Sequence, residues 1–74
     1  MYYLIRVDSR ELRYLKRYDS YNEAYKEMER DFKEEKEMDY CKDLSEDAYS
    51  FSYWNAWLGW DDESTDWFIT EGNN

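Results

Sequence analysis

The residues of this chain that could do chemistry are its carboxylates, its tryptophans and one cysteine. The 74 residues include 19 Asp and Glu, four Trp and one Cys, but no His and only two Gly. Without histidine the chain cannot build a Ser-His-Asp or Cys-His catalytic centre, a histidine-ligated zinc site or the usual proton shuttle near neutral pH. Two glycines are too few for a phosphate-binding loop or a dinucleotide fingerprint. These absences disfavour an enzyme, and we expect no cofactor.

Cys41 is the single thiol, and acidic residues lie close to it along the chain. Its neighbours include Asp39, Asp43 and Glu46, and negative neighbours raise the pKa of a thiol instead of lowering it. We therefore expect a half-buried structural cysteine and not a nucleophile. One cysteine cannot form an internal disulfide, whereas small domains from oxidising compartments carry several, so we expect a cytoplasmic protein.

Pairs of carboxylates could act as acid and base, or could bind a hard cation. Asp61 with Asp66 and Glu46 with Asp47 are such pairs. The polar run at residues 61–66 lacks the sixth-position glycine and the distal glutamate of an EF-hand loop. We interpret residues 61–66 as a turn whose carboxylates are hydrated, and we expect no metal site.

Charge is distributed unevenly along the chain. Residues 1–18 contain five basic and two acidic side chains, whereas residues 43–74 contain eight acidic ones and no Lys or Arg. The formal net charge of −9 repels phosphates and anionic lipids, so we expect neither direct nucleic-acid binding nor membrane attachment. Uncompensated carboxylates can instead attract a protein with a basic surface, including one built to grip nucleic acid. The alternative is that the acidity serves solubility alone.

Four tryptophans are more than a core of this size needs. Trp is strongly enriched at the energetic hot spots of protein interfaces. The alternative is that the rings close over the open end of a small sheet. A surface of exposed Trp rimmed by acid would suit a basic partner protein, or a second copy of the chain in a homodimer. The candidate partner-binding residues are Trp54, Trp57, Trp60, Asp61, Asp62, Glu63 and Asp66.

Two N-terminal segments have the alternating pattern of β-strands. Residues 2–7 form the opening strand, which would place on one face Tyr3, Ile5 and Val7 and on the other Tyr2, Leu4 and Arg6. Residues 11–18 fit a second strand that pairs back on the first. They also fit a short helix, because Leu12 and Leu15 are three residues apart, but we favour the strand.

A helix is predicted to follow, from Ser20 to about Asp39. Ser20-Tyr21-Asn22-Glu23 has the form of a capping box, in which the Ser20 hydroxyl and the Glu23 carboxylate accept hydrogen bonds from amides that the first helical turn leaves unpaired. The following apolar side chains recur at helical spacing and predict a stripe that packs on the sheet: Tyr21, Ala24, Tyr25, Met28 and Phe32.

The C-terminal third alternates again. A strand is predicted from Ala48, with Tyr49, Phe51 and Tyr53 on one face. A polar connection at 61–65 then leads to a strand at 66–70, and these last two strands are expected to form a hairpin, with 72–74 as a frayed tail. Residues 1–74 are thus predicted to form a small single α+β domain, an antiparallel sheet of three to four strands with one helix packed on it in the order β-β-α-β-β.

The helix entry Asp19-Ser20-Tyr21-Asn22-Glu23-Ala24 stands between an opening strand and an aromatic closing hairpin. This arrangement resembles short acidic proteins of phages and other mobile elements, among them anti-restriction and anti-CRISPR inhibitors. The resemblance covers most of the chain and implies a small intracellular protein that acts by binding, in some cases as a DNA mimic. It carries over no functional residue. The Arg-rich segment 6–17 departs from a uniformly acidic mimic, which leaves the C-terminal half as the candidate surface.

The sequence therefore predicts a non-enzymatic acidic protein that binds a basic partner protein, as an inhibitor that mimics nucleic acid. The alternative is a homo-oligomeric interaction or structural module that uses its Trp-rich surface. Salt-sensitive binding favours the first, and a mass that depends on concentration favours the second.

Overall fold

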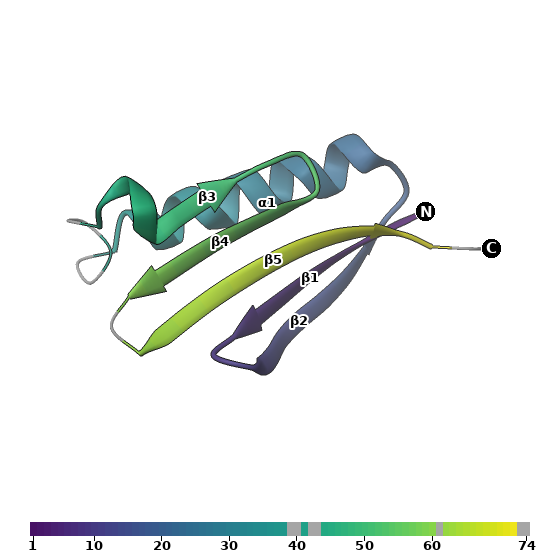
Figure 1. Ribbon diagram of the computed structural model, residues 1–74. Coiled ribbons are helices and arrows are strands. Elements are labelled where there is room, and N and C mark those ends of the chain that lie inside the picture. The colour runs from purple at the N-terminus through teal and green to yellow at the C-terminus, as the bar shows by residue number, and fades with distance from the viewer. Residues whose placement is uncertain (39–40, 42–43, 61, 73–74) are drawn as a thin grey trace.

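The first two strands are joined by a tight turn at Ser9 and Arg10. In the computed structural model (Figure 1), β1 (Tyr2–Asp8) pairs antiparallel with β2 (Glu11–Tyr18). Both turn residues have a positive φ, 47° at Ser9 and 76° at Arg10, as in the type I′ turns of two-residue hairpins. The strand prediction for residues 11–18 is confirmed, and the short-helix alternative is wrong. The structure describes residues 1–38, 41, 44–60 and 62–72.

Helix α1 (Tyr21–Lys36) begins at the predicted capping box. The Ser20 hydroxyl accepts a hydrogen bond from the Glu23 amide at 3.2 Å, and the Glu23 carboxylate accepts one from the Ser20 amide at 3.2 Å. The helix ends at Lys36, earlier than predicted. The predicted end, Asp39, lies outside the described residues.

The C-terminal part contains three strands where the sequence suggests two. A short 3₁₀ helix, η1 (Glu46–Ala48), leads into β3 (Tyr49–Phe51), which is followed by β4 (Asn55–Trp60) and β5 (Glu63–Glu71). The sheet therefore has five strands, and the prediction of three to four is too low. The predicted hairpin also changes, because β5 pairs with the unpredicted β4 and not with β3.

A turn at residues 52–54 separates β3 from β4. The Ser52 amide donates a hydrogen bond to the Asn55 carbonyl at 2.8 Å, and the Ser52 hydroxyl donates one to the Asn55 side chain at 2.6 Å. Tyr53 lies in this turn with 74% of its surface exposed, so its assignment to the strand is wrong. The aromatic alternation runs into the turn with no glycine or proline to mark it, which is why one strand was expected here.

The strand order is β2-β1-β5-β4-β3, and every neighbouring pair is antiparallel. The C-terminal strand β5 is thus inserted between β1 and β4. Its N-terminal residues Glu63, Ser64 and Thr65, expected in a connection, belong to the strand. Gly72 is tied back by a hydrogen bond from its amide to the Met1 carbonyl at 2.9 Å, and the rest of the predicted frayed tail lies outside the described residues.

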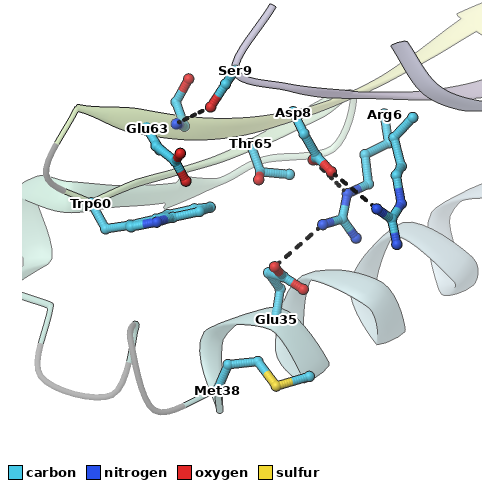
Figure 2. A pocket seen from close by; sticks show the side chains of 10 residues that line it. Arg6, Asp8, Ser9, Glu35, Met38, Trp60, Glu63 and Thr65 are labelled. Carbon is cyan, nitrogen blue, oxygen red and sulfur yellow. Dashed lines mark hydrogen bonds and ion pairs between the residues drawn. The ribbon is translucent and has the colours of Figure 1, made fainter. Parts of the chain in front are cut away.

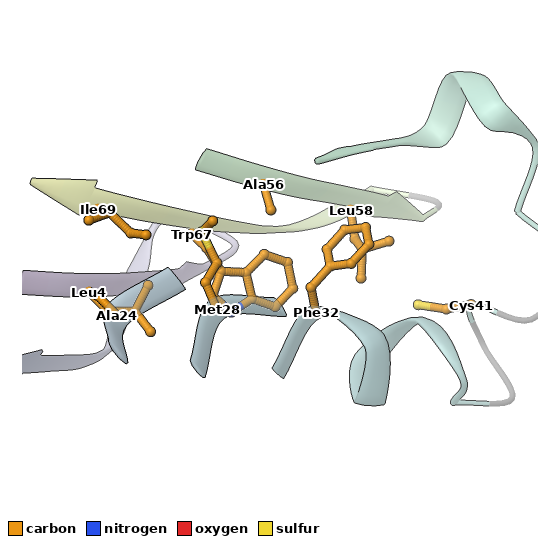
Figure 3. Packing of buried hydrophobic residues seen from close by; sticks show 9 residues of the cluster. All are labelled: Leu4, Ala24, Met28, Phe32, Cys41, Ala56, Leu58, Trp67 and Ile69. Atoms are coloured by element: carbon orange, nitrogen blue, oxygen red, sulfur yellow. The ribbon is translucent and has the colours of Figure 1, made fainter. Parts of the chain in front are cut away.

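Helix α1 packs on one face of the sheet only, in a small single-domain α+β fold (Figure 1). Between the two layers lies one apolar cluster (Figure 3), in which the Phe32 and Trp67 ring centroids are 5.6 Å apart. The nine buried members are Leu4, Ala24, Met28, Phe32, Cys41, Ala56, Leu58, Trp67 and Ile69. Among the described residues there is no helix with the length and apolar character of a membrane span.

Candidate functional site

An acidic groove of about 440 Å³ lies where β4 runs past the end of β3. The pairing of β3 with β4 reaches Leu58, so that Gly59 and Trp60 extend beyond it. Helix η1 and the beginning of β5 close the sides of this space. The lining consists of Ser45, Asp47, Ala48, Trp57, Gly59, Trp60, Asp62, Glu63 and Ser64; these residues are called the acidic groove below.

Glycine at position 59 determines how the Trp57 ring lies in the groove. A Cβ atom at Gly59 would be 2.6 Å from Cζ2 of Trp57 and would force the ring to move. With no side chain at this position, the indole approaches the β4 backbone closely. Trp60 lies on the opposite face of β4, where it packs against the core cluster, so the groove curves around the end of the strand.

The charged side chains that line the acidic groove are all carboxylates: Asp47, Asp62 and Glu63. No Lys or Arg lines it in the described part of the chain. Two indole rings beside three carboxylates can bind a cation, because the ring faces attract positive charge and the carboxylates accept its hydrogen bonds. A Lys or Arg side chain of another protein has both the positive charge and the hydrogen-bond donors that this groove can bind.

A second pocket, of about 520 Å³, lies between the sheet and the C-terminal end of α1 (Figure 2). It shares Trp60, Glu63 and Ser64 with the acidic groove. Figure 2 shows Trp60 on one side of this pocket, Arg6 on the other and Glu35 reaching up from the helix.

Arg6 is buried beside the second pocket, with 8% of its side chain exposed. It forms ion pairs with carboxylates from two elements, at 2.9 Å to Asp8 of β1 and at 3.0 Å and 3.3 Å to Asp31 and Glu35 of α1. Burial alone would lower the pKa of Arg6, but the hydrogen bonds to Asp8 and Asp31 outweigh it and raise the pKa. Arg6 is therefore a fixed, neutralised cation.

Asp31 accepts hydrogen bonds from three strands. The donors are Arg6 of β1, the Tyr14 hydroxyl of β2 and the Trp67 indole of β5, the last at 3.0 Å. Burial alone would raise the pKa of Asp31, but the hydrogen bonds from Trp67, Tyr14 and Arg6 outweigh it and lower the pKa. For Tyr14, burial and the hydrogen bond to Asp31 both raise the pKa. This network orients the helix on the sheet.

Thr65 brings an unsatisfied hydroxyl to the second pocket. Its side chain is fully buried, and its Oγ1 has no hydrogen-bond partner among the described residues. Figure 2 shows it between Trp60 and Arg6, directed from β5 toward the helix layer. A buried hydroxyl without a partner costs free energy, so Thr65 marks a local weakness of the fold.

The sequence-predicted site residues fall into three places. Trp57, Trp60, Asp62 and Glu63 meet in the acidic groove. Trp54, half exposed, lies elsewhere, with its ring centroid 4.8 Å from that of Tyr21. Asp66 is on the face of β5 that points away from the helix, because its neighbours Thr65 and Trp67 point toward the core. Asp61 lies outside the described residues.

No family model, curated protein or solved structure matches this chain.

Sequence reasoning missed Asp47 as part of the groove and missed the Arg6–Asp31 network. Asp47 lies before β3, and only the strand order brings η1 next to the beginning of β5. For Arg6 a signal was present, since it alternates with Leu4 on one face of a strand. That face is the one that α1 covers.

Cys41 is buried, with 1% of its surface exposed, and so is more enclosed than the predicted half-buried thiol. Burial, with a smaller contribution from the negative charge of Glu35, raises the pKa of the Cys41 thiol. Both effects keep the sulfur protonated. Within the described residues, no three His, Cys, Asp or Glu side chains are grouped closely enough to hold a metal ion.

Proposed function

We propose that this protein is a non-enzymatic binding protein whose acidic groove receives a Lys or Arg side chain from a basic surface of another protein. The observation that supports the proposal best is the composition of the groove. Trp57 and Trp60 stand beside Asp47, Asp62 and Glu63, and no basic residue of the described chain lines the space.

Two forces act on a cation in this groove. A cation over an indole face gains about 0.5–1 kcal/mol at an exposed site and about 2 kcal/mol when water is excluded. The carboxylates add a longer-range attraction, which raises the association rate and weakens as salt is added. Arginine suits the groove better than lysine, because its planar guanidinium can stack on indole while it donates hydrogen bonds to a carboxylate.

The partner class that we infer is a protein that itself binds nucleic acid. Such proteins present Lys and Arg at phosphate spacing, and the three carboxylates of the groove give them an alternative ligand. The protein would then act as an inhibitor that occupies a nucleic-acid site, inside the cell, where its single cysteine stays reduced.

Titration with a short Arg-rich peptide, followed by tryptophan fluorescence, tests the groove. The triple variant D47N/D62N/E63Q should weaken binding by about tenfold or more, because the attraction of three carboxylates is lost. The matched control E11Q/E37Q/E71Q removes three exposed carboxylates that do not line the groove. Equal weakening by the two triple variants would show that net charge, and not the groove, binds the peptide.

Capture of partners from a cell lysate tests the inferred partner class. A nucleic-acid-binding protein retained at low salt, and released both by high salt and by competing duplex DNA, would support mimicry. If the captured protein is released by salt but not by DNA, the groove binds a basic surface that is not a nucleic-acid site.

A further inference from the structure

The face of the sheet opposite α1 is apolar and carries no covering element among the described residues (Figure 1). On this open face lie the side chains that alternate with the core residues along β1, β2 and β5, and Trp57 of β4 lies beside them, opposite Asp66. Leu12, Leu15 and Phe68 are 64%, 54% and 43% exposed, and Ile5 and Val7 lie between them in the pairing register. A connected apolar surface of this kind is typical of an interface.

Two opposite charges lie at symmetric positions around Ile5. Arg17 is opposite Tyr3 on the β2 side, and Asp66 is opposite Val7 on the β5 side. Relative to Ile5, Arg17 therefore lies on the neighbouring strand β2, displaced by two residues toward the N-terminus of β1. Asp66 lies on the other neighbouring strand, β5, displaced by two residues toward the C-terminus of β1. The two charges are on one line through Ile5, at equal distances from it.

The ion pairs of the described residues leave both charges without an intramolecular counterion. Neither Arg17 nor Asp66 takes part in an ion pair within the described part of the chain. Burial raises the pKa of Asp66. A carboxylate on an apolar face is costly unless a cation from outside the molecule meets it.

We propose that the open face is the interface of a two-fold symmetric homodimer in which Arg17 of each copy pairs with the partner's Asp66. The proposal follows from the symmetry of the face. When two such sheets meet, a two-fold axis over Ile5 and perpendicular to the Arg17–Asp66 line places each Arg17 against the partner's Asp66. Both pairs form at once, and the apolar side chains between them are buried, as an isologous interface requires.

This interface shares one residue with the function proposed above, since Trp57 of the acidic groove lies opposite Asp66 in the β4–β5 pairing, but the two proposals rest on different charges. The carboxylates of the acidic groove come from η1 and from the β4–β5 connection with the first residue of β5, and they contribute no charge to the open face. The variant D47N/D62N/E63Q should therefore dimerise like the wild-type chain, so that failure of one proposal does not imply failure of the other.

Charge reversal tests the dimer, with sedimentation velocity measured over a concentration series up to the millimolar range. R17D and D66R should each weaken self-association by about tenfold or more, because each places like charges together at two contacts. The double variant R17D/D66R re-forms both pairs with exchanged signs and should restore the dissociation constant to within about threefold of the wild type. K26D and E71R make the same charge changes at exposed positions outside this face and should have little effect.

Three outcomes would overturn the proposal. The first is a wild-type chain that remains monomeric at millimolar concentration. The second is a dimer that the single reversals do not weaken, and the third is a folded double variant that does not recover. Circular dichroism and thermal unfolding establish which variants fold. Should the double variant not fold, L15Q decides, because Leu15 is 54% exposed and tolerates substitution; L15Q should weaken the dimer, and unchanged association would contradict this interface.

Discussion

Among single side chains, Asp31 has the widest reach across the fold. From helix α1 it accepts hydrogen bonds from β1, β2 and β5, and those strands are neighbours only in the folded sheet. Removing the carboxylate, or removing one of its donors, leaves buried polar groups without hydrogen-bond partners. The network therefore makes a large contribution to stability for one residue.

Replacement of Asp31 by Asn should destabilise the protein. Asn retains the shape but not the charge, so that Arg6 keeps only Asp8 and Glu35 and the indole of Trp67 donates to a weaker acceptor. We expect a loss of about 2–4 kcal/mol in the free energy of unfolding, measured with urea at neutral pH. The control E34Q changes an exposed carboxylate of the same helix and should cost much less. Equal losses for the two variants would show that the network is not stabilising.

The contribution of Asp31 should also depend on pH. Because its pKa is lowered in the folded state, its stabilisation is complete above the pKa of the unfolded carboxyl, about 3.9, and is lost as the pH falls toward the folded value. The stability difference between wild type and D31N should therefore be constant near neutrality and shrink below about pH 4. Urea unfolding at a series of pH values measures this, and a difference that persists in acid would contradict the lowered pKa.

Replacement of Thr65 by Val is expected to stabilise the protein, in contrast to replacement of Asp31. The buried hydroxyl of Thr65 has no partner among the described residues, so T65V, which replaces the hydroxyl by a methyl group of similar size, removes an unsatisfied polar atom. We expect T65V to raise the free energy of unfolding by about 1 kcal/mol. T65S keeps the hydroxyl and loses the methyl group, and it should destabilise. A T65V protein less stable than the wild type would show that the hydroxyl has a partner.

Among the elements, the β1–β2 hairpin contains the strained backbone of the fold. Arg10 has φ 76°, in the left-handed region that only glycine enters without cost. R10G should therefore increase the free energy of unfolding by about 0.5–1 kcal/mol. K16G places glycine within β2, where φ is not positive, and should decrease the free energy of unfolding. Thermal unfolding distinguishes the two, and a destabilised R10G variant would show that the turn does not limit stability.

For the whole molecule, the strand order separates the two kinds of charge. Strand β2, with the three basic residues Arg13, Lys16 and Arg17, is at one edge of the sheet, whereas η1, β3 and the acidic groove are at the other. The charge dipole of the molecule therefore runs across the sheet, from the basic β2 edge to the acidic β3 edge. A basic partner is attracted to one edge and repelled from the other, which orients it before contact.

This separation predicts a salt-dependent association rate. The rate constant for an Arg-rich peptide, measured by stopped-flow tryptophan fluorescence, should fall by about tenfold between low and high salt, while the dissociation rate changes much less. In D47N/D62N/E63Q the salt dependence should be shallower than in E11Q/E37Q/E71Q. Identical slopes would indicate that the peptide responds to net charge without being directed to the groove.

Local patterns in the sequence determined the elements that depend on nearby residues. The capping box at Ser20 and the apolar stripe after it predict the beginning and the buried face of α1, and alternation predicts β1 and β2. The division of β3 from β4 was missed, because the turn at Ser52 is stabilised by hydrogen bonds to Asn55 and carries no glycine or proline.

Tertiary structure decided which residues meet. Composition and spacing predict an acidic, Trp-rich C-terminal half. The antiparallel pairing of β3, β4 and β5 brings Asp47 to Asp62 and Glu63 and leaves Trp54 at the other end of β4, while the alternation along β5 places Asp66 on the open face. The insertion of β5 between β1 and β4 places Trp67 in the middle of the sheet, where its indole donates a hydrogen bond to Asp31 of α1. These pairings join residues far apart in the chain, and their free energy depends on strand order, which no short segment of sequence encodes.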